Sequence, residues 1–285
     1  PPRSTLFPYT TLFRSSDVCP SAPNSISLAL ADKIDVLVGM FGIGERPTGS
    51  KDPYALRRAA LGVIRLIMEN DLRLPLIEVI AVAHESYKED LLADSQESAA
   101  SLIDFISDRL KVHLRDSGYG HDVVSAAFAV AEEDDLWRMV ARVEALKNFL
   151  ASSAGADLLS AYTRASNIVR IEERADGVTY NVDANPELLV QSEEKMLFAH
   201  LISFEEKINS ALKEENFVAV MGAIAELRAP VDAFFDQVTV NCKDRALRKN
   251  RLCLLGKIRD SLKSVADFSL IRSEERRVGK ECRSR

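Results

Sequence analysis

Apolar residues recur at the spacing of an α-helix along most of the chain. The first stripe joins Leu30, Ile34, Leu37, Val38 and Phe41, and polar residues fill the positions between them. Asp52-Pro53 then gives a helix-start signal, because Asp can cap a helix and Pro is favoured at its first position. The predicted helices cover about 30–41, 53–69, 75–92, 97–115, 123–131, 136–146, 156–171, 187–213, 215–228, 231–240 and 244–265.

The clearest interruption of this pattern is the stretch 173–186. It contains Gly177, Asn181 and Pro186 and has no helical stripe, although a short strand near 178–182 fits its residues. We therefore predict a mainly α fold made of two helical bundles. The first would cover 16–172 and the second 187–271, with 173–186 as the linker. Pro230 would mark a turn within the second bundle.

Composition narrows the class of protein. Of the 285 residues, 47% are hydrophobic and 28% charged, as in ordinary globular proteins. No apolar run reaches the roughly 18–20 residues that cross a bilayer. The four cysteines form no C-x-x-C pair, and the N-terminus lacks the layout of a secretory signal. We therefore expect a cytoplasmic protein without a membrane partner.

The two ends of the chain are related to each other through the genetic code. Reversing and complementing a Ser15 codon gives an Arg codon, as at Arg272, and the same operation pairs Phe13 with Glu274. All fourteen positions of 2–15 pair with 272–285 in this way. We interpret 1–15 and 272–285 as an artefact, a sequencing adapter translated in both orientations around a piece of a longer gene.

This interpretation changes the charge of the chain. The formal net charge is −6, and the two end segments carry +2 and +3, so residues 16–271 carry −11. A basic C-terminal tail would indicate a nucleic-acid-binding arm. Because 272–285 is interpreted as an artefact, its positive charge is not evidence for such an arm.

No complete catalytic or metal-binding set is visible, so no catalytic and no metal residue is assigned. The four histidines are scattered without ligand spacing, and there is no G-x-S-x-G nucleophile motif. Asp32 and Asp35 lie three residues apart on one predicted helix face. Paired carboxylates can hold a metal, but no His lies nearby in sequence, so a solvated helix face is the favoured interpretation.

Residues 44–51 superficially resemble a phosphate-binding loop. Ser50 and Lys51 stand in the wrong order for that motif, and a helix precedes the loop instead of a strand. Lys51, Arg57 and Arg58 nevertheless lie close to a predicted helix start. A helix N-terminus with basic side chains can hold an anion, so these three are candidate phosphate contacts.

A cluster of cations opens the last predicted helix. Leu247, Leu255 and their apolar neighbours form the buried stripe, which leaves the cations at least partly exposed. One reading is a phosphate-binding face in which Asn250 or an arginine reads an unstacked base. The other is a solvated face paired with nearby aspartates. The candidate nucleic-acid contacts are Arg245, Arg248, Lys249, Asn250 and Arg251.

Two long segments carry a resemblance to a known family. Residues 27–67, with the run GIGERPTGSKDP and then LRRAALG, closely resemble the β subunit of bacterial-type heterotetrameric glycyl-tRNA synthetase. Residues 228–269, with the run CKDRALRKNRLCLLGKIRDSL, resemble the anticodon-binding region of the same subunit, a DALR-type helical bundle. The resemblance spans residues 17–271 in the same order.

The resemblance implies a role in attaching glycine to its tRNA with ATP. It implies that activation, with ATP and Mg, occurs in a separate α subunit, so that this chain needs no cofactor and binds glycine tRNA and that subunit but no DNA. Residues 16–172 would hold the end of an HD-like helical domain, with Asp32 of ADKID at its last carboxylate position. Residues 187–271 would form the DALR-type domain and place 245–251 toward tRNA. An alternative is a helical assembly module whose main partner is the α subunit.

Overall fold

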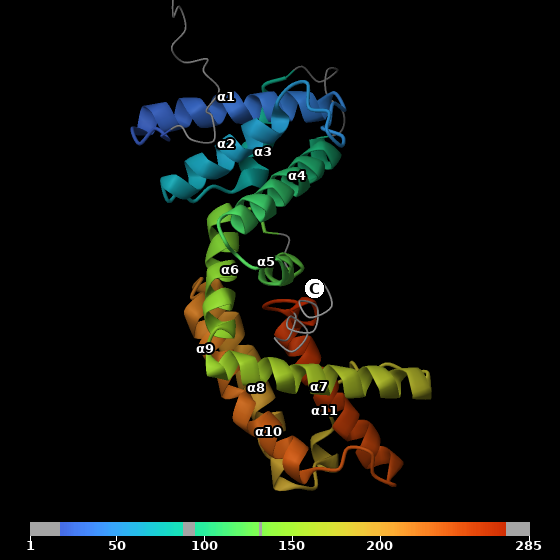
Figure 1. The fold of residues 1–285 in the computed structure, drawn as a ribbon. Helices are drawn as coiled ribbons and strands as arrows, with labels where there is room; N and C mark the ends of the chain where they lie inside the picture. Colours follow the sequence, from blue (N-terminus) through green and yellow to red (C-terminus); the bar gives the residue numbers. More distant parts are fainter. Residues whose placement is uncertain (1–17, 88–94, 131–132, 272–285) are drawn as a thin grey trace, which may run out of the picture. The chain divides into compact units, whose positions relative to one another are not determined.

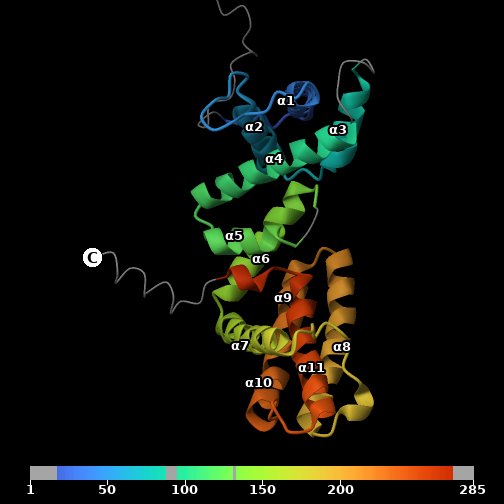
Figure 2. The same ribbon diagram turned by 90° about the vertical axis from the view of Figure 1, so that its right-hand side faces the viewer.

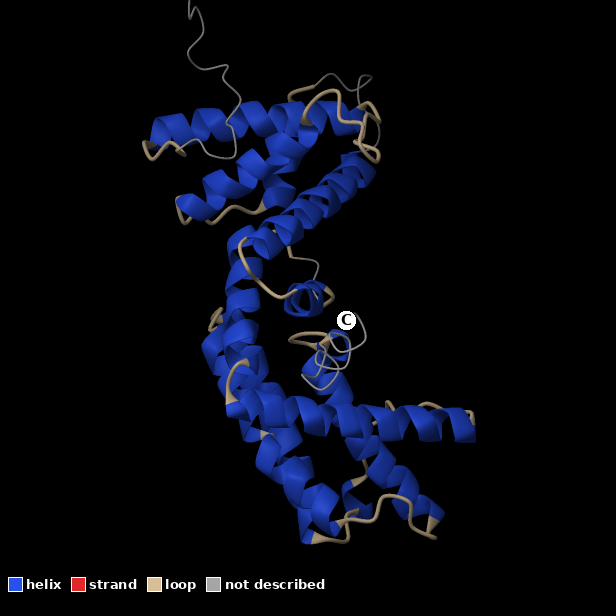
Figure 3. Ribbon diagram, viewed as in Figure 1, coloured by secondary structure: helices blue, strands red, loops and turns tan. Residues whose placement is uncertain are grey.

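The computed structural model describes residues 18–87, 95–130 and 133–271. Across these residues the chain is helical, with one isolated bridge between Thr48 and Lys51 and no strand (Figure 3). The predicted mainly α fold is confirmed. The predicted strand near 178–182 is wrong, because that stretch forms an irregular connection. The end segments 1–15 and 272–285 lie outside the described residues.

The chain divides into two compact units. Unit 1 contains residues up to Ser117 together with Glu133–Trp137, and unit 2 contains Gly118–Glu132 and the chain from Arg138 onward. Helix α6 (Leu136–Leu150) begins in unit 1 and continues in unit 2. None of the described helices is both long and apolar enough to cross a membrane.

The described part of unit 1 contains the helices α1 (Pro23–Gly42), α2 (Leu56–Glu69), α3 (Leu76–Glu85) and α4 (Ser95–Asp116), labelled in Figure 1. The predicted stripe of α1 is confirmed, since Leu37, Val38 and Phe41 are buried. Helix α2 packs against both α1 and α4. Residues 133–137 complete the unit, where Arg73 pairs with Asp135 at 2.7 Å.

The start of α2 differs from the prediction. Ala55 has a left-handed backbone (φ 55°), so the helix begins at Leu56 and not at Pro53. Asp52 still caps it, because its carboxylate accepts the backbone N–H groups of Leu56 at 2.8 Å and Arg57 at 3.0 Å. The capping residue was identified correctly, but the residues it caps lie further along the chain.

Unit 2 is a bundle built around α11 (Arg245–Lys263). Helix α7 (Ser153–Asp176) packs on α11 and α10 (Arg228–Gln237), and α8 (Ser192–Lys213) packs on α9 (Phe217–Glu226), α10 and α11 (Figure 2). The short α5 (His121–Phe128) packs on the 3-10 turn η2 (Phe268–Leu270). Pro230 lies in the first turn of α10, where its missing N–H costs nothing, and not in the predicted inter-helix turn.

The predicted linker 173–186 does not separate the two units. Helix α7 extends to Asp176 and belongs with α10 and α11, and the rest of the stretch lies along α11. A backbone contact explains why, because a Cβ at Gly256 would come within 1.9 Å of the Tyr180 carbonyl oxygen. The glycine in α11 therefore lets this stretch pack directly on the helix, and the division between units falls near 117–138 instead.

Candidate nucleic-acid interface

The cation run 245–251 occupies the first two turns of α11. Asp244 caps the helix, since its carboxylate accepts the backbone N–H groups of Ala246 at 2.8 Å and Leu247 at 3.1 Å. The packing of α11 against α7 and α8 decides which side chains of the run face inward. The five candidate residues consequently divide into buried, half-buried and exposed positions.

Arg251 is buried, with 7% of its surface exposed. Its guanidinium donates to the Glu194 carboxylate through Nε and to the Thr239 carbonyl oxygen at 2.9 Å through Nη1. Position 251 lies four residues after Leu247 and four before Leu255, so it falls on the apolar stripe. The predicted exposure of Arg251 is therefore wrong, and its role as a tRNA contact is not compatible with this position.

Glu194, the partner of Arg251, is fully buried at the start of α8. Its other carboxylate oxygen accepts the backbone N–H groups of Val190 at 2.7 Å and Gln191 at 2.8 Å. One carboxylate thus caps α8 and neutralises Arg251. A buried charge needs both a counter-charge and hydrogen bonds, and this pair has both.

Asn250 is also buried, at 5% exposure. Its side-chain oxygen accepts the backbone N–H of Asn185 at 2.7 Å, and its amide nitrogen donates to the Asn185 carbonyl oxygen at 3.1 Å. Both ends of the amide are therefore engaged with the connection before α8. The hypothesis that Asn250 reads an unstacked base is not supported by this geometry.

Arg248 is half-buried between α7 and α11. Its guanidinium contacts Glu172, donates to Asp176 at 2.7 Å and donates to the Asn241 side-chain oxygen at 3.2 Å. The Tyr180 hydroxyl also donates to Asp176. Hydrogen bonds from Tyr180 and Arg248 lower the pKa of Asp176, and the bond to Asp176 raises the pKa of Arg248. Arg248 therefore links two helices.

Arg245 and Lys249 are the exposed members of the run. They lie four residues apart and so share one face of α11. Within the described part of the chain, neither makes a hydrogen bond or ion pair. These two side chains are free to meet a phosphate, and their assignment as tRNA contacts stays a prediction.

Besides Arg164, helix α7 adds two exposed cations near its C-terminus that the sequence pattern did not single out. Arg170 and Arg174 lie four residues apart and line a shallow hollow with Glu173, Gly177, Val178 and Thr179. The sequence pattern predicts a helix end at 171, whereas α7 continues to Asp176 and includes Arg174. The four-residue spacing of Arg170 and Arg174 indicates a shared helix face only if the helix is known to extend past Arg174.

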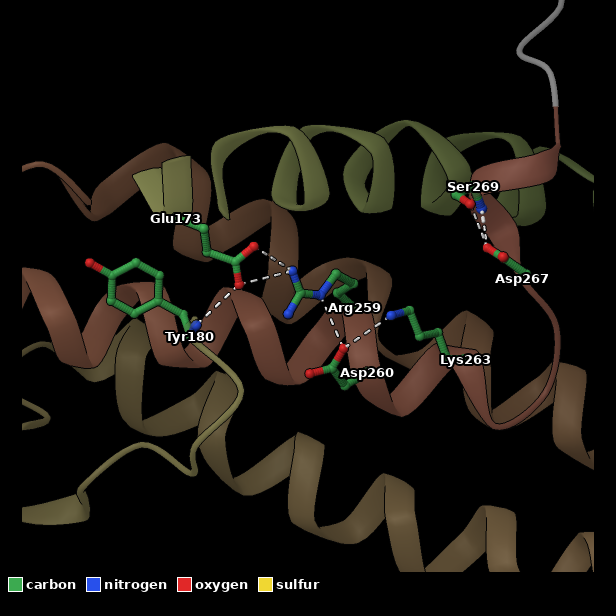
Figure 4. Close-up of polar contacts among 7 residues, drawn as sticks. All are labelled: Glu173, Tyr180, Arg259, Asp260, Lys263, Asp267 and Ser269. Atoms are coloured by element: carbon green, nitrogen blue, oxygen red, sulfur yellow. Dashed lines mark hydrogen bonds and ion pairs between the residues drawn. The ribbon is translucent and has the colours of Figure 1, made fainter. Parts of the chain in front are cut away.

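Further along α11 the charged residues are engaged with one another, as Figure 4 shows. Arg259 Nη1 lies 3.2 Å from both carboxylate oxygens of Glu173, and its Nε donates to Asp260 at 3.0 Å. Glu173 also accepts the backbone N–H of Tyr180 at 3.1 Å, and Lys263 lies 3.6 Å from Asp260. This second half of the helix therefore offers far less unpaired positive charge than Arg245 and Lys249 do.

The candidate phosphate contacts of unit 1 do not converge on the N-terminus of α2. The Asp52 carboxylate already occupies that end, and Arg57 donates to the Gly49 carbonyl oxygen at 2.7 Å. Lys51 and Arg58 are exposed. The predicted anion site at the start of α2 is therefore wrong in its location, because a side chain of the protein serves as the anion.

Asp32 and Asp35, the paired carboxylates of the first predicted helix, have different surroundings. Its side chain is 73% exposed and lies 3.7 Å from Lys33 Nζ. Asp35 accepts a hydrogen bond from the Tyr87 hydroxyl at 2.9 Å. The described residues contain no group of three or more His, Cys, Asp or Glu side chains arranged to hold a metal ion.

The sequence of unit 2 matches a known class of domain. Residues 158–271 match the family model of the DALR anticodon binding domain, and this helical domain begins within α7, ahead of the predicted linker. Residues 9–129 match the model described as glycyl-tRNA synthetase beta subunit. This match reaches into the segment 1–15, whose adapter origin stays a prediction.

Individual relatives agree with both models. The glycine–tRNA ligase beta subunit of Rhodospirillum centenum is 50% identical over 262 residues, which is 90% of this chain and 36% of the relative. That of Ruegeria sp. is 48% identical over 263 residues, covering 92% of this chain and 37% of the relative. The chain thus spans little more than a third of the length of these relatives.

Proposed function

We propose that this chain is the tRNA-binding part of a glycine–tRNA ligase β subunit. It would support the ATP-dependent attachment of glycine to its tRNA. The carrying observation is that residues 158–271, which match the anticodon-binding domain, hold the exposed pair Arg245 and Lys249. ATP and Mg would act in a separate α subunit of a cytoplasmic heterotetramer, and this chain would bind no DNA.

In the proposed mechanism, phosphate contacts supply affinity and base contacts supply specificity. Arg245 and Lys249, with Arg174 of α7, would neutralise backbone phosphates at the anticodon side of the tRNA. These contacts supply affinity that does not depend on sequence. Discrimination would come from unstacked anticodon bases, which proteins read through stacking and hydrogen bonds. Arg248, Asn250 and Arg251 would hold the helix that presents the two exposed cations.

Equilibrium binding of glycine tRNA to the whole chain at low and moderate salt tests this proposal. Arg245→Glu/Lys249→Glu should weaken binding and reduce the salt slope by about two, one for each lost phosphate contact. Lys195→Glu/Lys213→Glu is the matched control, because these exposed lysines of α8 give the same change in net charge. A tRNA with a replaced anticodon separates base reading from phosphate binding.

Each outcome has a distinct meaning. Loss of binding in the α11 variant with a normal control supports the proposal. Equal binding of both tRNAs removes the anticodon-reading part, and equal effects of the two variants remove the assigned surface.

The second candidate function is an assembly module for the α subunit. The net charge of −6 favours it, because a negative chain opposes long-range attraction to tRNA. An apolar subunit interface should be almost insensitive to salt, whereas phosphate binding weakens steeply. Salt-independent capture of purified α subunit by a folded chain that binds no tRNA would establish this alternative.

A further inference from the structure

A groove between α2 and α4 in unit 1 gathers cations that no element of the proposed function uses. It encloses about 530 Å³, within the size range of small-ligand sites. Arg58, Leu61 and Arg65 line it from α2, at positions i, i+3 and i+7. The α4 residues on the opposite wall have the same periodicity and are Arg109, Val112, His113 and Asp116.

Two of these arginines lack an anionic partner. Arg58 is exposed, and neither it nor Arg109 forms a hydrogen bond or ion pair with any described residue. The Arg109 Nε is shielded from solvent and has no acceptor, while its guanidinium lies 5.9 Å from the Phe105 ring centre. A shielded donor without an acceptor costs free energy, which an incoming oxyanion would recover.

The other two arginines of the groove are already engaged. Arg65 donates to Glu69 at 2.7 Å, and Arg57 is held by the Gly49 carbonyl oxygen. The Glu69 pKa is lowered, first by the hydrogen bond from Arg65 and to a smaller extent by the nearby His113. Asp116, at the end of α4, is the carboxylate that lines the groove itself. Positive charge therefore exceeds negative charge between the two helices.

The groove also has an apolar wall. Val112 is exposed on it and Leu61 is half-buried opposite, while Gly62 contributes no side chain. An inorganic anion needs only the guanidiniums. A ligand that carries a phosphate on an organic body would also cover the apolar side chains, and this combination is the chemistry of a nucleotide.

We propose that the α2–α4 groove binds a nucleotide phosphate, held by Arg58 and Arg109, with the sugar or base against Leu61 and Val112. The nucleotide is either free in solution or part of an RNA strand, because both present the same phosphate and apolar body. The site is separate from α11 and does not depend on the proposed role of Arg245 and Lys249.

Binding of AMP, inorganic phosphate and a short single-stranded RNA to the whole chain tests the groove. Arg58→Gln and Arg109→Gln should each weaken nucleotide binding on the order of tenfold, since each removes a charge-assisted contact. Lys51→Gln is the control, because it removes an exposed cation of unit 1 that does not line the groove. Circular dichroism confirms that each variant is folded.

Comparing the three probes distinguishes a free nucleotide from a nucleotide within an RNA strand. AMP binding that falls in both groove variants identifies a free-nucleotide site, and RNA binding that falls without AMP binding identifies a strand site. Absence of binding to all three probes, or equal effects of Lys51→Gln and the groove variants, overturns the proposal. The Arg245→Glu/Lys249→Glu chain should bind AMP normally, so failure here is separable from failure of the proposed function.

Discussion

Arg245 and Arg251 lie six positions apart on one helix and have opposite environments. Arg245 is exposed and makes no hydrogen bond or ion pair with the described residues, whereas Arg251 is buried against Glu194. Removing one member of a buried pair leaves the other charge desolvated, which costs far more than the pair itself contributes. The two arginines therefore separate a binding role from a structural one.

Replacing Arg251 should destabilise the protein strongly. We expect Arg251→Met to lower the free energy of unfolding by about 3–5 kcal/mol, because Glu194 would stay buried without its counter-charge. Arg245→Met, the matched exposed position, should change it by less than about 0.5 kcal/mol. Urea unfolding measures both. Similar values for the two variants would contradict the assigned burial of Arg251.

Asp176 should make the free energy of unfolding depend on pH in the acidic range. Its folded-state pKa is lowered by hydrogen bonds from Tyr180 and Arg248, so its contribution is present above the unfolded-state pKa and is lost as pH falls through the folded-state pKa. Asp176→Asn should therefore be less stable than the wild type at neutral pH, with the difference shrinking in acid below about pH 4. A difference that stays constant from pH 7 to pH 2 would exclude this linkage.

At the scale of elements, two glycines in helices have opposite surroundings. A Cβ at Gly256 in α11 would approach the Tyr180 carbonyl oxygen to 1.9 Å, whereas one at Gly222 in α9 would meet no atom within 4 Å. Both positions are helical, so the difference lies in packing and not in backbone propensity.

Alanine at these two positions should have effects of opposite sign. Gly256→Ala forces the connection after α7 away from α11 and should cost about 1–3 kcal/mol. Gly222→Ala should stabilise by about 0.5–1 kcal/mol, since alanine is the better helix former. Thermal unfolding of both variants measures the signs. Destabilisation by Gly222→Ala would mean that its open surroundings are misassigned.

Helix periodicity predicted the type of most elements and much of the core. It failed at Ala55, where a left-handed residue delays α2, because no local pattern distinguishes that conformation from a helical turn. It failed again at 173–186, whose irregular residues resemble a linker but pack on α11 through Gly256. That contact joins positions 76 residues apart in sequence, and no local pattern contains it.

The candidate site shows the same limit. The sequence located the cation run and the apolar stripe of α11. Because both occupy the same two turns, periodicity alone does not decide which cations are buried. Whether Arg248 or Arg251 faces solvent depends on carboxylates from α7 and α8, which are far away in sequence. Exposure of Arg245 and Lys249 could therefore be assigned only with the packed bundle.

At the scale of the whole molecule, the two compact units predict separable unfolding. Trp137 is the only tryptophan, belongs to unit 1 and lies with its ring 5.1 Å from the Arg73 guanidinium. Its fluorescence should report on unit 1, while far-ultraviolet circular dichroism reports on all helices. We expect Gly256→Ala to shift the dichroism transition and leave the fluorescence midpoint nearly unchanged. Equal shifts of both signals would show one cooperative unit.

The Glu194 carboxylate joins the start of α8 to Arg251 and, through that guanidinium, to the carbonyl of Thr239. During evolution, substitutions at positions 194 and 251 should therefore be coupled to each other. A lineage that loses either charge passes through a chain with a bare ion in its interior. The two codons should therefore be inherited as a pair, or be exchanged together for neutral residues.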